Sequence, residues 1–295
     1  MSRLSYAIAG GVLGAACLGV AAYAQQPAPP PFATTKVADN VYVFRYGGHQ
    51  SMFVVTSAGV IATDPIAYGR PQAAVTYVDE IKKVSSQPIK YLIYSHQHFD
   101  HIAGGKPFKD AGATIIAHTR AKEWLLALRD PHTVLPDETV DTARTITLGD
   151  TTLELTYLGP NHSDSTLVMR LPKEKVLFAV DFIPVGTVPG RGMLDFYPIQ
   201  AEDSMKKVLA MDWVTLIPGH PGQPNGRLGT KQDVQDQLTF LQDASAAVKA
   251  EAQAGKCWDG VEKDLKLPKY QSWPGYEQNL PFVLRRYCGL WGRGF

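Results

Sequence analysis

The chain has 295 residues, with 29 Lys and Arg against 28 Asp and Glu and a formal net charge of +1. This balance lacks the basic excess that binding to nucleic acid or to an anionic membrane surface requires. The length and the 45% of hydrophobic residues suffice for one large domain with a substantial core. We therefore expect a small-molecule substrate and no nucleic-acid partner.

The first 24 residues are predicted to be a secretory signal peptide. Arg3 supplies a positive start, residues 7–22 are apolar, and residues 22–24 (Ala-Tyr-Ala) fit the small-x-small pattern that precedes cleavage. A membrane anchor is the alternative, but the apolar stretch is at or below the roughly 20 residues that span a bilayer. Lipidation at Cys17 is disfavoured by the residues before it. We expect cleavage after Ala24, a periplasmic or secreted protein and no stable membrane anchor.

The rest of the chain is predicted to form one domain. Residues 25–35 are rich in proline and are expected to be a stiff, disordered leader. Residues 36–295 form the domain, with a helical and aromatic C-terminal extension from about residue 230. Beyond the signal peptide only Cys257 and Cys288 remain, and they fit either a disulfide or two separate buried thiols.

Hydrophobic patterning places strands and helices alternately along the chain. The predicted strands cover residues 41–45, 51–55, 59–64, 91–95, 113–117, 151–158, 166–171, 175–180 and 214–217. The predicted helices cover residues 71–84, 106–111, 119–129, 200–211 and 230–254. In the third of these helices, Trp124, Leu125 and Leu128 are expected to share the apolar face. Strands interleaved with helices in both halves predict a layered α/β fold.

The strongest chemical signal is His96-Gln97-His98-Phe99-Asp100-His101, which holds three of the eight histidines. A turn after the preceding strand would direct His96 and His98 to one point, and Asp100 and His101 to a second. Imidazole and carboxylate are ligand types that zinc prefers. A solvated polar turn has no need of three histidines, so metal binding is the favoured interpretation.

Three further candidate ligands follow predicted strands. His162 lies in a Gly-Pro-Asn-His loop, Asp181 ends the strand 175–180, and His220 lies in a Pro-Gly-His-Pro-Gly loop. Loops at strand ends on one edge of a sheet are where α/β proteins build their sites. A turn-capping role for Asp181 and core positions for the two histidines are the alternatives.

Together these motifs resemble those of the metallo-β-lactamase-fold hydrolases. The pattern H-x-H-x-D-H-x-x-G-G covers residues 96–105, G-x-x-H covers 159–162, and P-G-H covers 218–220. The resemblance spans about residues 36–225 and implies an αββα sandwich with metals on one edge. It also implies which residues bind each metal: His96, His98 and His162 the first, Asp100, His101 and His220 the second, and Asp181 both.

Three departures from related patterns narrow the subfamily. Gln97 replaces the Glu of the diiron flavoproteins of this fold, and Asp181 replaces the Cys of the β-lactamases that use a thiolate. A complete second site disfavours the persulfide dioxygenases, which bind one iron. No inserted nucleic-acid domain of the kind carried by RNA-cleaving relatives is found.

The resemblance implies two zinc ions per chain, with iron or manganese as alternatives. Two metals about 3.5–4 Å apart can share an acidified water, so we expect a bridging hydroxide to attack the substrate. Asp100 is the predicted catalytic residue, orienting that hydroxide and carrying its proton to the leaving atom. The expected enzyme is a secreted dizinc hydrolase that opens an acyl C–O or C–N bond in a lactone, ester or β-lactam.

Other functions remain open. A glyoxalase-II-like thioesterase is disfavoured because its substrate is cytosolic, whereas this chain carries an export signal. An iron-dependent oxidoreductase needs a redox metal, and a non-catalytic metal-binding protein would bind zinc without turnover. His49 and Tyr197 are candidates for contact with substrate, while His118 is expected to be structural and His132 merely exposed. The substrate and the oligomeric state cannot be predicted from the sequence.

Overall fold

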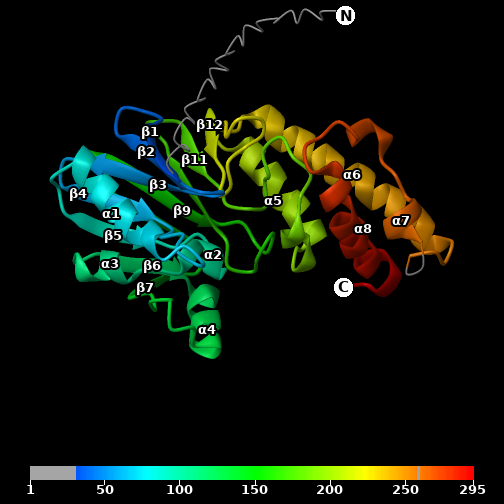
Figure 1. The fold of residues 1–295 in the computed structure, drawn as a ribbon, viewed down its shortest axis with the longest axis horizontal. Coiled ribbons are helices and arrows are strands. Elements are labelled where there is room, and N and C mark those ends of the chain that lie inside the picture. Colours follow the sequence, from blue (N-terminus) through cyan, green and yellow to red (C-terminus); the bar gives the residue numbers. More distant parts are fainter. Residues whose placement is uncertain (1–30, 258–259) are drawn as a thin grey trace, which may run out of the picture. The chain divides into compact units, whose positions relative to one another are not determined.

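The computed structural model describes residues 31–257 and 260–295 (Figure 1). The predicted signal peptide and residues 25–30 of the predicted leader lie outside these described residues. Within the described ranges, none of the helices combines the length and the apolar character needed to cross a membrane.

Two β-sheets form the centre of the fold (Figure 1). The seven-stranded sheet has its strands in chain order: β1 (Phe32–Lys36), β2 (Val41–Tyr46), β3 (His49–Thr56), β4 (Gly59–Thr63), β5 (Ile89–Ile93), β6 (Thr114–His118) and β7 (Glu138–Val140). The five-stranded sheet has the order β12 (Thr215–Ile217), β11 (Val176–Phe178), β10 (Leu167–Leu171), β9 (Thr151–Tyr157) and β8 (Ala143–Leu148). Pairing is antiparallel from β1 to β4 and from β8 to β11, and parallel from β4 to β7 and between β11 and β12.

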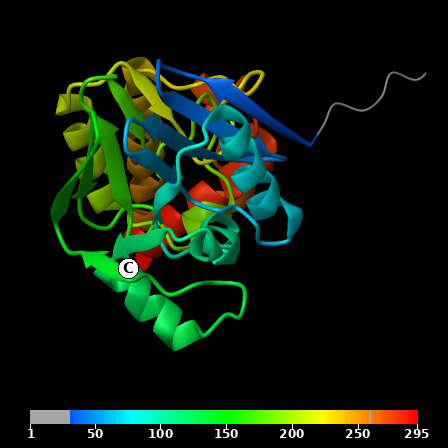
Figure 2. The same cartoon turned by 90° about the vertical axis from the view of Figure 1, so that its left-hand side faces the viewer.

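Helices cover the outer face of each sheet (Figures 1 and 2). The first half of the chain supplies α1 (Gln72–Val84), α2 (Phe99–Ile102), α3 (Lys106–Asp110) and α4 (Thr119–Leu128). The second half supplies η1 (Arg191–Leu194), α5 (Pro198–Ala210), α6 (Lys231–Gln253), α7 (Val261–Asp264), η2 (Pro268–Tyr270) and α8 (Tyr276–Arg293).

Burial of both faces of the strands explains the layering. In β2, Val41 and Val43 point into a core between the two sheets, whereas Phe44 points into a core beneath α1. Alternate side chains on a strand point to opposite faces, so a strand apolar on both faces must be covered on both. A third core joins the five-stranded sheet to α5, α6 and α8. The predicted αββα sandwich is confirmed.

The N-terminal boundary of the domain lies earlier than the sequence predicts. Residues 32–36 form β1, which pairs with β2 from Phe32 opposite Tyr46 to Lys36 opposite Tyr42. The leader predicted over residues 25–35 is therefore wrong from Phe32 onward. The proline run preceding this short edge strand masks it in the sequence.

The orientation of α4 also differs from the prediction. Only Leu125 of the three expected apolar-face residues is buried, while Trp124 and Leu128 are 43% and 53% exposed. The helix lies at the lower end of the molecule in both views and packs against β6 and β7 (Figures 1 and 2). The described residues therefore leave the side chains of Trp124 and Leu128 about half uncovered.

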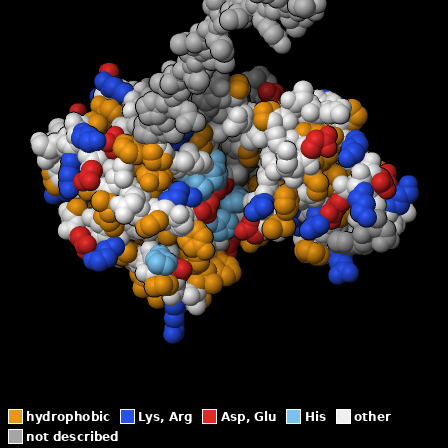
Figure 3. Space-filling view, viewed as in Figure 1, with side chains coloured by type: hydrophobic (Ala, Val, Ile, Leu, Met, Phe, Trp, Pro, Cys, Tyr) orange, Lys and Arg blue, Asp and Glu red, His pale blue; other side chains and the backbone are white. Residues whose placement is uncertain are grey.

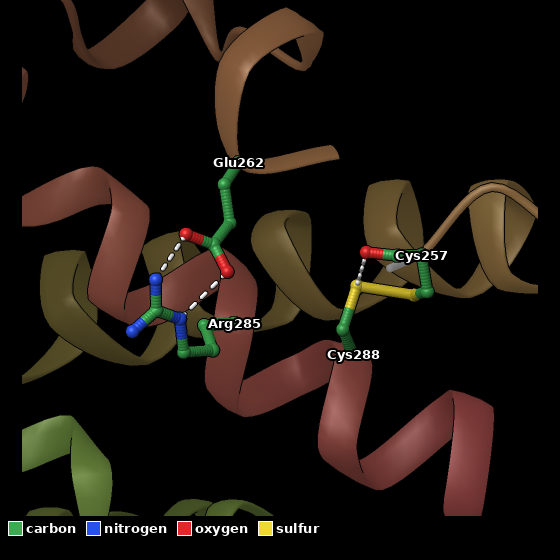
Figure 4. Close-up of a disulfide and its surroundings, with 4 residues drawn as sticks. All are labelled: Cys257, Glu262, Arg285 and Cys288. Atoms are coloured by element: carbon green, nitrogen blue, oxygen red, sulfur yellow. Dashed lines mark hydrogen bonds and ion pairs between the residues drawn. A yellow bond between two sulfur atoms is a disulfide. The ribbon is translucent and has the colours of Figure 1, made fainter. Parts of the chain in front are cut away.

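A disulfide links the segment after α6 to α8. Cys257 is bonded to Cys288 of α8, with the two Cα atoms 5.4 Å apart (Figure 4). Nearby, the Arg285 guanidinium donates two hydrogen bonds of 2.6 Å to the Glu262 carboxylate of α7. Of the two states that the sequence left open for these cysteines, the structure has the disulfide.

Replacing both cysteines by Ala is expected to lower the free energy of unfolding by about 4 kcal/mol, because the bond closes a loop of 31 residues in the unfolded chain. Denaturant unfolding without reductant measures the loss. Reductant should lower the unfolding midpoint of the wild type and leave that of the double variant unchanged. Equal midpoints for wild type and variant would contradict the prediction.

Candidate metal centre

Four loops that follow strands converge on one hollow of the surface. His96 follows β5, His162 follows β9, Asp181 follows β11 and His220 follows β12. In Figure 3 histidine and acidic side chains fill the hollow between two parts of the molecule. The structure brings together all seven residues predicted from the sequence: His96, His98, Asp100, His101, His162, Asp181 and His220.

Three histidines form the first group of this cluster. One ring nitrogen from each of His96, His98 and His162 lies within 4.8 Å of the other two. His162 Nε2 is 2.9 Å from His98 Nδ1, so these two nitrogens face the same point. His96 Nε2 is buried and has no hydrogen-bond partner among the described residues. Three converging imidazoles with an unpartnered buried nitrogen fit a metal site.

The second group contains a residue beyond those expected from the motif. Asp100, His101 and His220 are joined by His49, again with donor atoms within 4.8 Å of one another. Asp100 Oδ2 lies 3.0 Å from His49 Nε2 and 3.5 Å from His101 Nε2. His49 therefore borders the cluster, where its ring contacts the carboxylate of Asp100 directly.

Asp181 lies between the two groups. Its Oδ2 is 2.9 Å from His101 Nε2 and 3.6 Å from His162 Nε2, and its Oδ1 is 3.4 Å from His220 Nε2. The backbone of Asp181 has φ +68°, a region that residues other than glycine seldom adopt. Such strain is typical of functional sites. One carboxylate in contact with both histidine groups is the arrangement that a shared ligand requires.

Hydrogen bonds fix the outer nitrogens of the rings. His98 Nε2 lies 2.8 Å from Asp195 Oδ2, and His220 Nδ1 donates to the carbonyl oxygen of Gly48 at 2.7 Å. Partners of this kind select the tautomer of a metal-binding histidine and hold its other nitrogen toward the ion.

A buried carboxylate lies behind His101. Asp64 Oδ2 is 3.7 Å from His101 Nδ1, and Asp64 Oδ1 accepts a hydrogen bond from the Ser95 amide at 2.7 Å. Burial raises the pKa of Asp64 to about 6, although the neighbouring His101 opposes that rise. The sequence analysis missed Asp64, despite the signal it shares with Asp181: an acid that ends an apolar strand.

The electrostatics of the cluster favour a bound cation. Burial and the neighbouring imidazoles hold the pKa of His96 well below its usual value, and burial lowers the pKa of His162 to about 4. These rings are therefore neutral at pH 7 and keep a lone pair for a metal. Burial alone would lower the pKa of His101, but the carboxylate of Asp181 raises it to about 9. The carboxylates thus attract positive charge, and the donor set fits divalent metal ions such as zinc.

Gln97 connects the two loops that carry the first group. Its Oε1 accepts hydrogen bonds from the hydroxyls of Ser163, at 2.7 Å, and Ser165. The backbone amide of Gln97 also donates a hydrogen bond to Ser165 Oγ at 3.2 Å. The side chain that departs from the diiron pattern therefore has a positioning role here.

A mainly apolar cavity of about 830 Å³ opens from the cluster. Its walls include Val185, Val188, Met193 and Phe196 of the loop after Asp181, together with Asn279 of α8. The sequence analysis carried no signal for Asp195 or Asn279, which both line this cavity. Both residues reach the site only through tertiary packing.

The C-terminal extension holds this wall in place. Asn279 Nδ2 donates to the Val188 carbonyl oxygen at 2.9 Å, and Arg286 Nε donates to that of Phe196 at 2.5 Å. Thr187 Oγ1 donates to the Pro274 carbonyl oxygen at 2.8 Å. The helix α8 therefore contributes Asn279 to the wall of the cavity and holds the rest of that wall by hydrogen bonds.

The other two histidines lie outside the cluster. His118 ends β6 and caps α4, where its ring accepts a hydrogen bond from the Arg120 amide at 3.2 Å. The predicted structural role of His118 is confirmed. His132 is exposed in the loop after α4, as expected.

Comparison with known proteins identifies the family. The model of the metallo-beta-lactamase superfamily matches residues 69–220. The chain is 26% identical over 195 residues to 2,4-dinitroanisole O-demethylase subunit alpha of Nocardioides sp. (strain JS1661), covering 65% of this chain and 58% of that protein, less than two-thirds. It is 26% identical over 203 residues to metallo-beta-lactamase type 2 of Elizabethkingia meningoseptica, covering 66% and 77% of the two chains.

A solved structure supports the fold. The metallo-beta-lactamase from Pontibacter korlensis superposes with a TM-score of 0.64 at 19% identity, covering 72% of this chain and 99% of that one. The chain belongs to the metallo-beta-lactamase superfamily of metal-dependent hydrolases. The predicted family and enzyme class are confirmed; the ligand roles, the number of ions, the substrate and export stay predictions.

Gly219→Ala is expected to weaken zinc binding about tenfold without removing a ligand, the low end of the effect of disturbing a ligand's surroundings. A Cβ at Gly219 would lie 2.7 Å from Asp181 Oδ1 and 2.8 Å from His101 Cε1. Competition with a zinc chelator measures the affinity. Gly48→Ala is the control, because its Cβ meets nothing within 4 Å. Equal affinities in wild type and Gly219→Ala would contradict the prediction.

Proposed function

We propose that the protein is an exported hydrolase that binds two zinc ions and opens an acyl C–O or C–N bond in a small molecule. In this proposal His96, His98 and His162 hold one ion, and Asp100, His101 and His220 hold the other. Asp181 contacts both. The observation that carries the proposal is the position of the Asp181 carboxylate, within 3.6 Å of ring nitrogens from each group.

Bound zinc would polarise the substrate carbonyl and lower the pKa of water toward 7. In hydrolysis the C–O bond to water forms, the bond from the acyl carbon to its oxygen or nitrogen substituent breaks, and a proton moves from the water to that leaving atom. Asp100 is the proposed carrier of this proton. Burial opposes its ionisation, but the hydrogen bond with His49 and the charge of His101 outweigh burial and hold the pKa of Asp100 below its usual value. Asp100 is therefore ionised at pH 7, the form whose oxygens can accept a hydrogen bond from the attacking water.

The adjoining cavity supports a largely apolar substrate. Its walls would hold the acyl portion mainly by burial of apolar surface. Lactones, carboxylic esters and β-lactams fit this description. The relatives named metallo-beta-lactamases favour testing the β-lactam first, and the apolar stretch before residue 24 supports export.

One relative favours a second candidate. The name 2,4-dinitroanisole O-demethylase subunit alpha indicates cleavage of an aromatic methyl ether. Hydrolysis of an activated aryl ether would use the same metal-activated water. 2,4-Dinitroanisole therefore belongs in the panel of test substrates.

The test measures hydrolysis of a carbapenem, a lactone, a carboxylic ester and 2,4-dinitroanisole by the zinc-loaded protein. We expect turnover of at least one acyl substrate, abolished by a chelator and restored by zinc. Turnover of the ether alone would replace the acyl proposal by the second candidate. Zinc bound without turnover of any of the four, or activity that depends on iron, would contradict the proposal.

His96→Ala and Asp181→Ala are expected to lose zinc and activity together. The loss of activity should exceed the about 10- to 100-fold typical of removing a ligand's hydrogen-bond partner. Metal analysis and initial rates measure the two effects, and circular dichroism checks the fold. His132→Ala is the matched control, since it removes an exposed histidine outside the cluster. Full activity in either cluster variant at normal zinc content would contradict the ligand assignment.

A further inference from the structure

A second cavity, of about 410 Å³, borders the cluster on the side of α4. We call it the α4 pocket, and its apolar walls are Phe99, Trp124, Leu128 and Tyr197. His98 and Asp195 border both this pocket and the larger cavity. A ligand at the cluster therefore has room for two substituents, one in each cavity.

Several polar groups that line the α4 pocket are already bonded within the protein. Trp124 Nε1 donates to Asp164 Oδ1 at 3.0 Å, which fixes the indole ring. Ser163 donates to Gln97, and Asp195 pairs with His98. What the pocket offers a ligand is therefore mainly aromatic and aliphatic surface.

Two large apolar side chains beside the pocket are exposed to water, which is unfavourable in free energy. Trp124 and Leu128 remain 43% and 53% exposed beside the pocket, although both are large apolar side chains. Contiguous apolar surface next to a cleft marks ligand contact. An aromatic ring gains both area burial and ring–ring contact when it packs against such side chains.

The charges at the pocket select against anions. Asp164 and Asp195 both contribute carboxylates to its wall. Arg120, the cation that pairs with Asp164, lies 3.7 Å from it and does not line the pocket. An anionic ring substituent would meet repulsion here, whereas an uncharged ring would not.

We propose that the α4 pocket binds an uncharged aromatic substituent of the substrate while the scissile bond lies at the cluster. This inference rests on the proposed function and adds to it a substrate class, aryl-substituted esters, lactones or β-lactams. Trp124 is the principal specificity-determining residue, and it takes no part in metal binding.

Paired hydroxamic acids, which bind zinc and differ only in a phenyl group, test the proposal by calorimetry on the zinc-loaded protein. We expect phenylacetohydroxamic acid to bind about tenfold more tightly than acetohydroxamic acid, or about 1.4 kcal/mol. Trp124→Ala should reduce this preference to about twofold or less. Leu128→Ala should reduce it in the same direction. Leu126→Ala is the control and should keep it, because Leu126 is 50% exposed on α4 but lines neither cavity.

An equal preference in wild type and Trp124→Ala, or no preference in the wild type, would overturn the proposal. A second measurement does not depend on zinc. Titrating the metal-free protein with benzyl alcohol should shift the NMR signal of the Trp124 indole N–H, identified by its absence from Trp124→Ala. If neither hydroxamate binds but this signal shifts, the zinc assignment fails and the pocket stands. If the signal does not move, the pocket assignment fails whatever the metal content.

Discussion

The buried carboxylate of Asp181 is the interaction on which the rest of the site depends. It lies within 4 Å of nitrogens from His96, His101, His162 and His220, which come from the three segments that follow β5, β9 and β12. A lone buried carboxylate is unfavourable unless cations or donors surround it. Here the imidazoles supply that environment, and divalent metals would supply it more strongly. The two sheets position these loops at a common edge.

Much of the surrounding structure limits the movement of these loops. Gln50 of β3 donates two hydrogen bonds to the loop of His220. Its side-chain Nε2 donates to the Pro218 carbonyl oxygen, and its backbone amide donates to that of Gly219. These two bonds hold the loop in place. For the first histidine group, Gln97 bonds to Ser163 in the loop of His162, and Asp195 pairs with the ring of His98. The extension beyond the family match continues this arrangement, because α8 holds the wall of the larger cavity. The C-terminal extension therefore shapes the larger cavity, while the proposed metal ligands all lie between residues 96 and 220.

The sequence predicts those features that depend on residues close together in the chain, and it does not predict those that depend on tertiary packing. The spacing of His96, His98, Asp100 and His101 is local, and the strand-end positions of the other three ligands are visible in the hydrophobic pattern. The interleaving of strands and helices predicts the layered α/β class, and the resemblance of the motifs implies the αββα sandwich. In contrast, Asp195 and Asn279 lie in segments without a distinctive pattern, and only packing brings them to the site. The exposed face of α4 was mispredicted for the same reason: periodicity marks an apolar face but does not say whether anything covers it.

The central claim is that two metal ions share Asp181. X-ray absorption at the zinc edge of the protein with two equivalents of zinc tests this claim most directly. The account predicts two zinc ions bound per chain, nitrogen and oxygen ligands without sulfur, and scattering from a neighbouring zinc. Binding of a single zinc, or two zincs with no zinc–zinc scattering, would contradict it.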